Sequence, residues 1–480
     1  MKQLIQLENF AALLSKAWKN HIPDFPSLGK LAGRFPRRVG DPACSNGQSC
    51  RLRDLTRRLL LAALLTAGAV VAELPGAAIS DRQLSAKAGD AWRAAWDRFF
   101  DERTYLFYDY VCSYDPAQQL AGLPTPAEAA QQKPNPNGWG TGMEDCAISG
   151  GLMLAMVCDR FAATGDAAMC PYAQKVFVGL KALVESSTTD GFVCRGLCPA
   201  DGKSHYPESS RDQYTWYIYG LWRYYHSSIA LTEDKAAIRK LITAVCVRME
   251  RNIVPGRNFS IGKDTGTFDG IVDKMWENMA HEVARLPMIY AIGADITGDK
   301  HWKDLARRYS VEAAAKSKEA STKVPYALLQ QQTSLEVLQQ LEDDPALKQQ
   351  WLEAMRLVAE RSQGFLTKCL KYQPPSGDSL NFDWRTWPLK KSGPYLVPTR
   401  PEALLAEDRT IREPAEAALV LLLRPAPQLT PEQLALVKRM IAQVDYSKVV
   451  YYGHYYQLAL YWRAVRLGVL KLPATKRRGV

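Results

Sequence analysis

Two kinds of predicted helix alternate along residues 84–470, and this alternation limits the folds that the chain can adopt. The helices expected from residues 170, 233, 300, 346 and 431 are amphipathic and carry charged faces. Those expected from residues 144, 211, 274 and 452 are rich in aromatic or small residues and carry few charges. A helix that is apolar around its whole circumference must be enclosed by protein. Helix starts are predicted near Ala88, Glu144, Cys170, Arg211, Glu233, Lys274, Lys300, Pro325, Ala346, Glu402, Pro431 and Tyr452.

The links between the predicted helices also alternate in length. Short links with Thr, Asp or Pro as helix-start signals lead to the amphipathic helices: ATGDAA, LTEDKA, ITGDKH, LEDDPA and LTPEQL. Most links in the other direction are long: residues 111–143, 187–210, 252–273 and 363–401. Long loops in a compact domain are usually functional. The pattern predicts six helical hairpins in a ring with a site on the long-loop face. A two-domain helical bundle or an open solenoid is the alternative.

Residues 205–226 (HYPESSRDQYTWYIYGLWRYYH) are expected to form the most distinctive inner helix. Ser210 lies three residues before Gln213, as in a capping box, and this spacing predicts a helix start near Arg211. Asp212 then falls in the first turn, where the helix dipole stabilises a carboxylate. The aromatic residues that follow point around the whole helix, so we expect it to be enclosed. The alternative for Asp212 is a carboxylate that serves only its own helix end.

Residues 84–470 resemble the (α/α)6 toroid of the six-hairpin glycosidase superfamily. The features that carry the resemblance are the ATGD and ITGD turns, DGFVCRG and SSRDQYTWYIYGL. The resemblance implies an all-α fold of six helical hairpins with long loops on one face. It also implies a site at the N-terminal ends of the inner helices that acts on glycans with paired carboxylates. Toroids of this kind also include lyases, sugar epimerases and members with no enzymatic role.

Carboxylates at the predicted inner-helix starts are the catalytic candidates, because a glycosidase needs one acidic group on each side of the scissile bond. Asp212 is the first choice, since its aromatic neighbours would shape a sugar subsite. Glu144 and Asp145 come second, because they follow the glycine-rich segment 137–142 (NGWGTG). The alternative for each is helix capping or a solvated loop position.

Aromatic side chains in the long loops are expected to bind substrate, because pyranose rings present apolar faces. Trp139, Trp384 and Trp387 are the best candidates, since their loop positions make a core packing role less automatic. Trp276 would serve equally well as a core residue.

Cations predicted on the same face would suit an acidic sugar such as a uronic acid, because arginine can hold a carboxylate through two hydrogen bonds. Arg195, His205, Arg211 and Lys263 belong to this group. The alternative is that the arginines pair with acidic residues of their own loops.

Two further candidates come from the predicted inner helices. His281 lies in NMAHEVA, where a lone histidine is more often a hydrogen-bonded core residue. If the chemistry were that of a lyase, His205 or His281 would act with Tyr214 or Tyr455 as acid and base. Tyr214 and His281 complete the predicted substrate-binding set.

Charge and motif content exclude several classes of function. The formal net charge is +11, but residues 1–72 hold 11 Lys and Arg against 4 Asp and Glu, and the remainder holds 50 against 46. The body is therefore close to neutral, and no nucleic-acid partner is expected. The sequence has no Walker A, dinucleotide-binding or G-x-S-x-G motif. We expect no cofactor and no required metal.

The N-terminal region indicates export. Residues 51–72 (RLRDLTRRLLLAALLTAGAVVA) have a basic start, an apolar run and a small-residue exit, as in a signal peptide. Residues 1–50 are expected to be disordered or to precede the true translation start. Residues 51–78 would be the signal peptide or a membrane-proximal segment, residues 84–470 the toroid, and residues 471–480 a basic tail. An uncleaved segment would anchor the protein. Export would also permit a local disulfide between Cys194 and Cys198.

The sequence therefore predicts a secreted or periplasmic carbohydrate-active enzyme, a glycoside hydrolase acting on an oligo- or polysaccharide, with uronic-acid-containing glycans among the candidate substrates. A polysaccharide lyase on the same fold is the first alternative. A glycan-binding or structural toroid without catalysis is the second.

Overall fold

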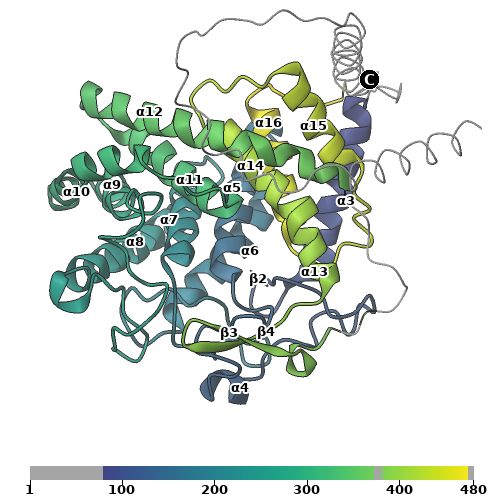
Figure 1. The fold of residues 1–480 in the computed structure, drawn as a ribbon, viewed down its shortest axis with the longest axis horizontal. Helices are drawn as coiled ribbons and strands as arrows, with labels where there is room; N and C mark the ends of the chain where they lie inside the picture. The colour runs from purple at the N-terminus through teal and green to yellow at the C-terminus, as the bar shows by residue number, and fades with distance from the viewer. Residues whose placement is uncertain (1–78, 372–379, 381, 474–480) are drawn as a thin grey trace, which may run out of the picture. The chain divides into compact units, whose positions relative to one another are not determined.

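The computed structural model describes residues 79–371, 380 and 382–473, and this part of the chain is mostly helical, as predicted (Figure 1). The predictions for residues 1–50 and for the signal-like segment 51–72 lie outside the described residues, as does most of the basic tail.

Six of the described helices are buried around nearly their whole circumference. They are α5 (Cys146–Thr164), α7 (Arg211–Tyr225), α9 (Arg285–Thr297), α11 (Pro325–Leu341), α14 (Glu413–Leu422) and α16 (Gly453–Arg466). Each contacts the next in this order, and α16 contacts α5, so the contacts close a cycle. The apolar helices of the sequence are thus the central helices of the described part.

Amphipathic helices pack outside this cycle with one face exposed. They are α3 (Asp81–Ala94), α6 (Met169–Glu185), α8 (Thr232–Asn252), α10 (Lys300–Lys318), α12 (Pro345–Ser362) and α15 (Pro431–Ala442). The shorter elements are α4 (Pro126–Ala130), α13 (Glu402–Glu407), η1 (Ala95–Phe99), η2 (Pro255–Arg257), η3 (Gln363–Lys371), η4 (Trp384–Thr386), η5 (Asp408–Arg412), β1 (Phe100–Asp101), β2 (Leu106–Phe107), β3 (Leu389–Ser392) and β4 (Tyr395–Pro398).

Helices α5 and α7 approach each other closely because glycines face each other across their contact. A Cβ atom added to Gly151 would lie only 2.1 Å from the carbonyl oxygen of Trp216. A Cβ atom on Gly220 would lie 2.6 Å from the Cα of Gly151. The small residues that make α5 apolar in sequence therefore also set the distance between the two helices that carry the predicted carboxylates.

Two predicted helix starts differ clearly from the structure. The helix expected near Ala88 begins earlier, at Asp81, where Ser80 and Gln83 form a capping box. The helix expected near Lys274 begins at Arg285. Lys274 instead forms an isolated antiparallel bridge with Ser260, and Glu277 has a φ of 50°. These backbone conformations exclude a helix, and Pro287 fits into the first turn of α9, where its missing N–H has no intrahelical acceptor.

The long segment 363–401, predicted as a loop, contains a β-hairpin made of β3 and β4. Asn135 donates a hydrogen bond of 3.1 Å from Nδ2 to the carbonyl oxygen of Leu396, and Pro398 packs against Gly140. In Figure 1 the hairpin and α4 lie together at the lower edge of the view. The hairpin thereby covers the glycine-rich loop that precedes α5.

A buried ion network occupies the opposite ends of the central helices. Asp159 of α5 lies 2.5 Å from Arg223, 2.6 Å from Arg466 and 3.7 Å from Arg463. Burial alone would raise the pKa of Asp159, but the arginines lower it to about 2. The charges here are paired with one another, whereas the other end of the helices is open to a cavity.

Helix α5 is the one described helix that is long and apolar enough to cross a membrane by length and composition. Most of it is buried inside the protein, as in the core helix of a folded domain.

Candidate functional site

A cavity of about 510 Å³ lies at the N-terminal ends of the central helices. The starts of α5, α7 and α11, the turn η5 and the hairpin β3–β4 all contribute to its wall. It brings together five residues that the sequence singled out: Trp139, Glu144, Asp145, Arg195 and Asp212. A smaller cavity of about 320 Å³ lies at the other ends of α9 and α11 and contains none of the predicted residues. We therefore take the larger cavity as the candidate active site.

Glu144 is fixed firmly in the wall. The Gly140 amide donates a hydrogen bond of 2.7 Å to Glu144 Oε2, and Arg400 forms an ion pair with Oε1. Only 4% of the Glu144 side chain is exposed. Both carboxylate oxygens are occupied, so Glu144 is better placed to hold the glycine-rich loop than to transfer protons.

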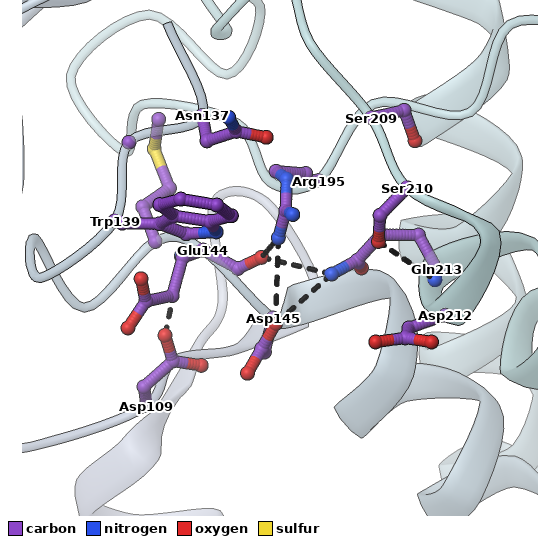
Figure 2. Close-up of polar contacts among 12 residues, drawn as sticks. Asp109, Asn137, Trp139, Glu144, Asp145, Arg195, Ser209, Ser210, Asp212 and Gln213 are labelled. Atoms are coloured by element: carbon purple, nitrogen blue, oxygen red, sulfur yellow. Dashed lines mark hydrogen bonds and ion pairs between the residues drawn. The ribbon is translucent and has the colours of Figure 1, made fainter. Parts of the chain in front are cut away.

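Asp145 is more accessible, with 18% of its side chain exposed. Its Oδ1 accepts a hydrogen bond of 3.0 Å from Gln213 Nε2 and lies 3.5 Å from Arg195, while its Oδ2 accepts one of 3.0 Å from the Tyr452 hydroxyl. Figure 2 shows the Gln213 amide and the Arg195 guanidinium directed at this carboxylate. Three different segments of the chain therefore orient Asp145.

Asp212, in the first turn of α7, has 27% of its side chain exposed and is paired with the buried Arg285 of α9. Burial would raise the pKa of Asp212, but nearby positive charges hold it below the ordinary value. The largest of these contributions comes from Arg285, followed by Arg211 and Arg195. Asp212 is consequently ionised at neutral pH. Because Asp212 pairs with a residue of another helix, α9, it does more than serve the end of its own helix, which was the alternative role.

The capping box predicted at the start of α7 is formed only in part. The Ser210 hydroxyl accepts a hydrogen bond of 3.4 Å from the Gln213 amide nitrogen. The Gln213 side chain does not return to Ser210 but donates to the Glu144 carbonyl oxygen at 2.9 Å and to Asp145. The second half of the motif is thus used to connect the starts of α5 and α7.

Asp109 is a buried acidic residue of this region that sequence reasoning missed. It accepts a hydrogen bond of 3.1 Å at Oδ2 from the Glu144 amide (Figure 2), and its Oδ1 has no partner in the described part of the chain. Burial, followed by the charges of Asp145 and Glu144, raises its pKa well above the ordinary value. Asp109 therefore keeps its proton at pH values where an ordinary aspartate is ionised. Nothing in the local sequence marks it, because its neighbours lie far away along the chain.

Asp109→Asn should make the protein more stable than the wild type as pH rises. An unfolded Asp109 ionises near pH 4, whereas the folded protein keeps the proton, so the wild type loses stability from that pH up to the raised pKa. We expect the difference to grow by at most about 1.4 kcal/mol per pH unit in this window. Urea denaturation from pH 4 to pH 8 measures this difference in the free energy of unfolding between the variant and the wild type. Asp115→Asn, at an exposed position, should follow the wild type throughout. A difference independent of pH would contradict the assignment.

The turn η5 and the segment before α13 contribute cations that the sequence reasoning also missed. Arg400 donates a hydrogen bond of 2.8 Å to the Tyr451 hydroxyl in addition to its pairing with Glu144. Arg412 lies 3.2 Å from Asp408 and 2.8 Å from Glu416. Both arginines line the cavity. A charged stretch, EDRTIREPAE, was the local signal for Arg412, and Arg400 lies outside it.

Trp139 is a half-buried aromatic residue in the cavity wall. Its backbone amide donates a hydrogen bond of 3.0 Å to Asn135 Oδ1. Its ring lies 5.8 Å from the Arg195 guanidinium and 6.3 Å from the Tyr395 ring. A fixed, partly exposed ring of this kind can stack on an apolar face of a ligand.

Several predicted cations lie outside the cavity wall, each paired with a carboxylate. His205 lies 2.8 Å from Asp264; although burial lowers the pKa of His205, the hydrogen bond that it donates to the Asp264 carboxylate raises this pKa to about 11. Arg211 is paired with Glu282. Lys263, another cation on this face, lies 2.8 Å from Glu208. Each of these cations pairs with a carboxylate of another segment, whereas the alternative supposed pairs within one loop.

The remaining predicted binding residues also lie outside the wall. The Tyr214 hydroxyl is buried, accepting from the Val193 amide and donating to the Gly191 carbonyl, each at 3.1 Å. His281 lies 3.7 Å from Glu282, and its pKa is lowered, mainly by burial.

The three other tryptophans of the predicted set pack into the body. Trp276 lies 4.7 Å from the Tyr309 ring, and Trp387 lies 5.5 Å from the Tyr110 ring. Trp384 donates a hydrogen bond of 3.0 Å to the Gly122 carbonyl. All three are buried, so a position in a long loop did not by itself indicate exposure.

In the described part of the chain, no group of three or more His, Cys, Asp or Glu is arranged to hold a metal ion. Cys194 and Cys198 are both buried free thiols.

Comparisons with known proteins do not assign a family. No protein-family model matches the chain, and no curated protein matches it. Among solved structures, the chain is similar to a sugar epimerase from a ruminal bacterium, with a TM-score of 0.46 and 10% sequence identity. The similarity covers 79% of this chain and 98% of the epimerase chain. A likeness this low carries no argument about activity.

Proposed function

We propose that this protein is a carbohydrate-active enzyme, a glycoside hydrolase in which Asp145 and Asp212 form the catalytic carboxylate pair. The observation that carries the proposal is that both carboxylates face one cavity from the starts of neighbouring helices, α5 and α7. Each is held by side chains from other segments, so their positions are fixed before a ligand arrives.

The proposal includes an (α/α)6 toroid, with the cycle of six central helices as its inner ring. The closed order of contacts from α5 to α16 and back to α5 supports this arrangement, as do the amphipathic helices outside it. In such a ring the inner helices point their N-terminal ends to one face. That face is where the cavity and the long loops lie.

The environment of Asp212 favours one of the two roles. Arg285 keeps Asp212 ionised, so Asp212 suits the group that stabilises positive charge at the sugar carbon or activates water. Because the reaction also needs an acid, we assign the protonation of the leaving oxygen to Asp145, the other carboxylate that faces the cavity. Cleavage then delivers a proton to that oxygen and the hydroxyl of water to the sugar carbon. Trp139 would stack on the sugar ring.

We further propose that the enzyme acts outside the cytoplasm, with residues 51–72 as its export signal. The basic start and apolar run of that segment are the support. N-terminal sequencing of the exported protein would show cleavage after this run, and a mature chain beginning near Met1 would contradict the proposal.

Product analysis tests the reaction type. The full chain is incubated with a panel of neutral and uronic-acid polysaccharides in ¹⁸O-labelled water. A hydrolase should release new reducing ends carrying one ¹⁸O and no unsaturated sugar. Unsaturated uronate absorbing in the near ultraviolet, without ¹⁸O, would show a polysaccharide lyase instead. Binding of a glycan without any product would favour a non-catalytic glycan-binding protein.

A further inference from the structure

Arg412 is a cavity-lining cation whose hydrogen-bonding capacity is only partly used. Its Nε lies 2.8 Å from Glu416 and its Nη1 lies 3.2 Å from Asp408. Its guanidinium is fixed over the rings of Tyr452 and Tyr456, at 4.9 Å and 5.5 Å. Among the described residues, Nη2 has no hydrogen-bond partner. The group is therefore rigidly placed with one nitrogen free for a ligand.

Gln330 of α11 lines the same cavity and is 3% exposed, yet within the described structure its Oε1 has no hydrogen-bond partner. A buried amide without a partner costs about 1–3 kcal/mol, so such a group is favourable only when something else compensates. A ligand hydroxyl would satisfy this oxygen once the amide, whose residue lines the cavity, turns it toward the ligand. Gln330 is thus an independent sign that the cavity accepts a polar ligand at this point.

Tyr326 stands one turn before Gln330 on α11 and offers an aromatic surface. It lines the cavity, is 42% exposed, and lies 5.9 Å from the Arg412 guanidinium. The pKa of Tyr326 is raised, mainly by burial and secondly by the negative charge of Asp212. Tyr326 therefore lies within electrostatic range of both Arg412 and the proposed catalytic carboxylate.

We propose that Arg412, Gln330 and Tyr326 form a subsite for a uronic acid unit of the substrate, next to Asp212. This inference rests on the proposed function and identifies its substrate class. Arg412 binds the sugar carboxylate through Nη2, Gln330 hydrogen-bonds a ring hydroxyl, and Tyr326 packs against the sugar face.

Two carboxylates, Asp408 and Glu416, flank Arg412, and two features of the wall offset their negative charge. Burial raises the pKa of Glu416 to about 7 in spite of the nearby Arg412, so this carboxylate is partly protonated at neutral pH. Lys390 of β3 adds a second cation to the wall, and it forms no ion pair with another described residue. His205, Arg211 and Lys263, the cations first suggested for this purpose together with Arg195, are paired elsewhere.

Matched ligands test the subsite directly. Trisaccharides of galacturonate, glucuronate and mannuronate are each titrated into the full-length protein by calorimetry, beside their carboxyl-reduced neutral counterparts. At least one uronate should bind about 10-fold or more tightly than its reduced form, the size expected for a hydrogen-bonded charge pair. The double variant Arg412→Gln/Glu416→Gln should lose this preference. It removes the cation together with its buried anionic partner, and its second partner, Asp408, is 27% exposed and remains in contact with water.

Control variants separate the subsite from general effects. Arg409→Gln alters a neighbouring arginine of η5 that pairs with Glu402 and does not line the cavity, and it should keep the preference. Gln330→Met should weaken the uronate and its reduced form equally. If circular dichroism shows that the double variant is unfolded, Arg412→Lys takes its place, and the preference should again fall because the planar fork is lost.

The proposal is overturned if no uronate is preferred by the wild type, or if the preference survives the change at Arg412. Turnover of a neutral glycan without any uronate preference would retain the hydrolase and remove the subsite. A uronate preference that depends on Arg412, without turnover of any glycan, would retain the subsite and remove the hydrolase.

Discussion

Asp212→Asn should lower kcat/KM by about 10³-fold, the size typical of removing a positioned acid–base group. Asparagine keeps the shape of the side chain but cannot carry the negative charge that Arg285 stabilises. The measurement is the kcat/KM of wild type and variant on the glycan identified by product analysis. Asp145→Asn should cause a loss of similar size, because hydrolysis needs both carboxylates.

The control for Asp212 must account for Arg285, which is 1% exposed and would lose an anionic partner. A buried charge without its partner destabilises a protein, so some loss of melting temperature is expected with Asp212→Asn. Glu282→Gln removes another carboxylate of the same arginine cluster, at 3.9 Å from Arg285, but Glu282 does not line the cavity. Glu282→Gln should lose stability and retain most activity. If Asp212→Asn stayed fully active, the catalytic assignment would be wrong.

Gly151→Ala should destabilise the protein by about 3 kcal/mol, at the upper end of the range for overpacked cores. The added methyl group would lie 2.1 Å from the Trp216 carbonyl oxygen, which belongs to the backbone of α7 and cannot rotate away. Helices α5 and α7 would have to separate, and the hydrogen bonds of Gln213 to the start of α5 would lengthen. Urea denaturation measures the loss, and activity should fall with it.

Gly89→Ala is the matched control for this change. Gly89 lies within α3, where an added Cβ would meet only the Arg93 side chain, at 3.8 Å. Because alanine is a better helix former than glycine, this variant should be slightly more stable than the wild type, by about 0.5–1 kcal/mol. Equal stabilities of the two variants would show that α5 and α7 do not approach as closely as described.

Local signals in the sequence were sufficient for the helices and for one part of the cavity wall. The Ser210 hydroxyl that caps α7, the glycine-rich segment before α5 and the acidic first-turn residues act over a few positions of the chain. Glu144, Asp145 and Asp212 therefore lie at helix starts, as predicted. Where the local signal was weaker, as before α9, the predicted start was about 11 residues too early.

The residues that surround these carboxylates could not be predicted from local sequence signals. Asp109, Arg400 and Arg412 come from segments that meet the helix starts only after folding. These three residues matter because they are buried and because of the charged groups that they contact. No short sequence pattern reports either property. Trp384 and Trp387 show the converse, because loop positions suggested exposure but packing against the body buried them.

The sequence alone predicted a helical chain, the enclosure of four of the six central helices, and acidic residues at the starts of α5 and α7. Helix periodicity and capping depend on neighbours three or four positions away, so a single sequence contains them. The ionised state of Asp212 beside Arg285, the retained proton of Asp109 and the lack of a partner for Gln330 Oε1 among the described residues follow only from the folded structure. Those properties depend on desolvation and on contacts between distant segments, which exist only once the helices have packed.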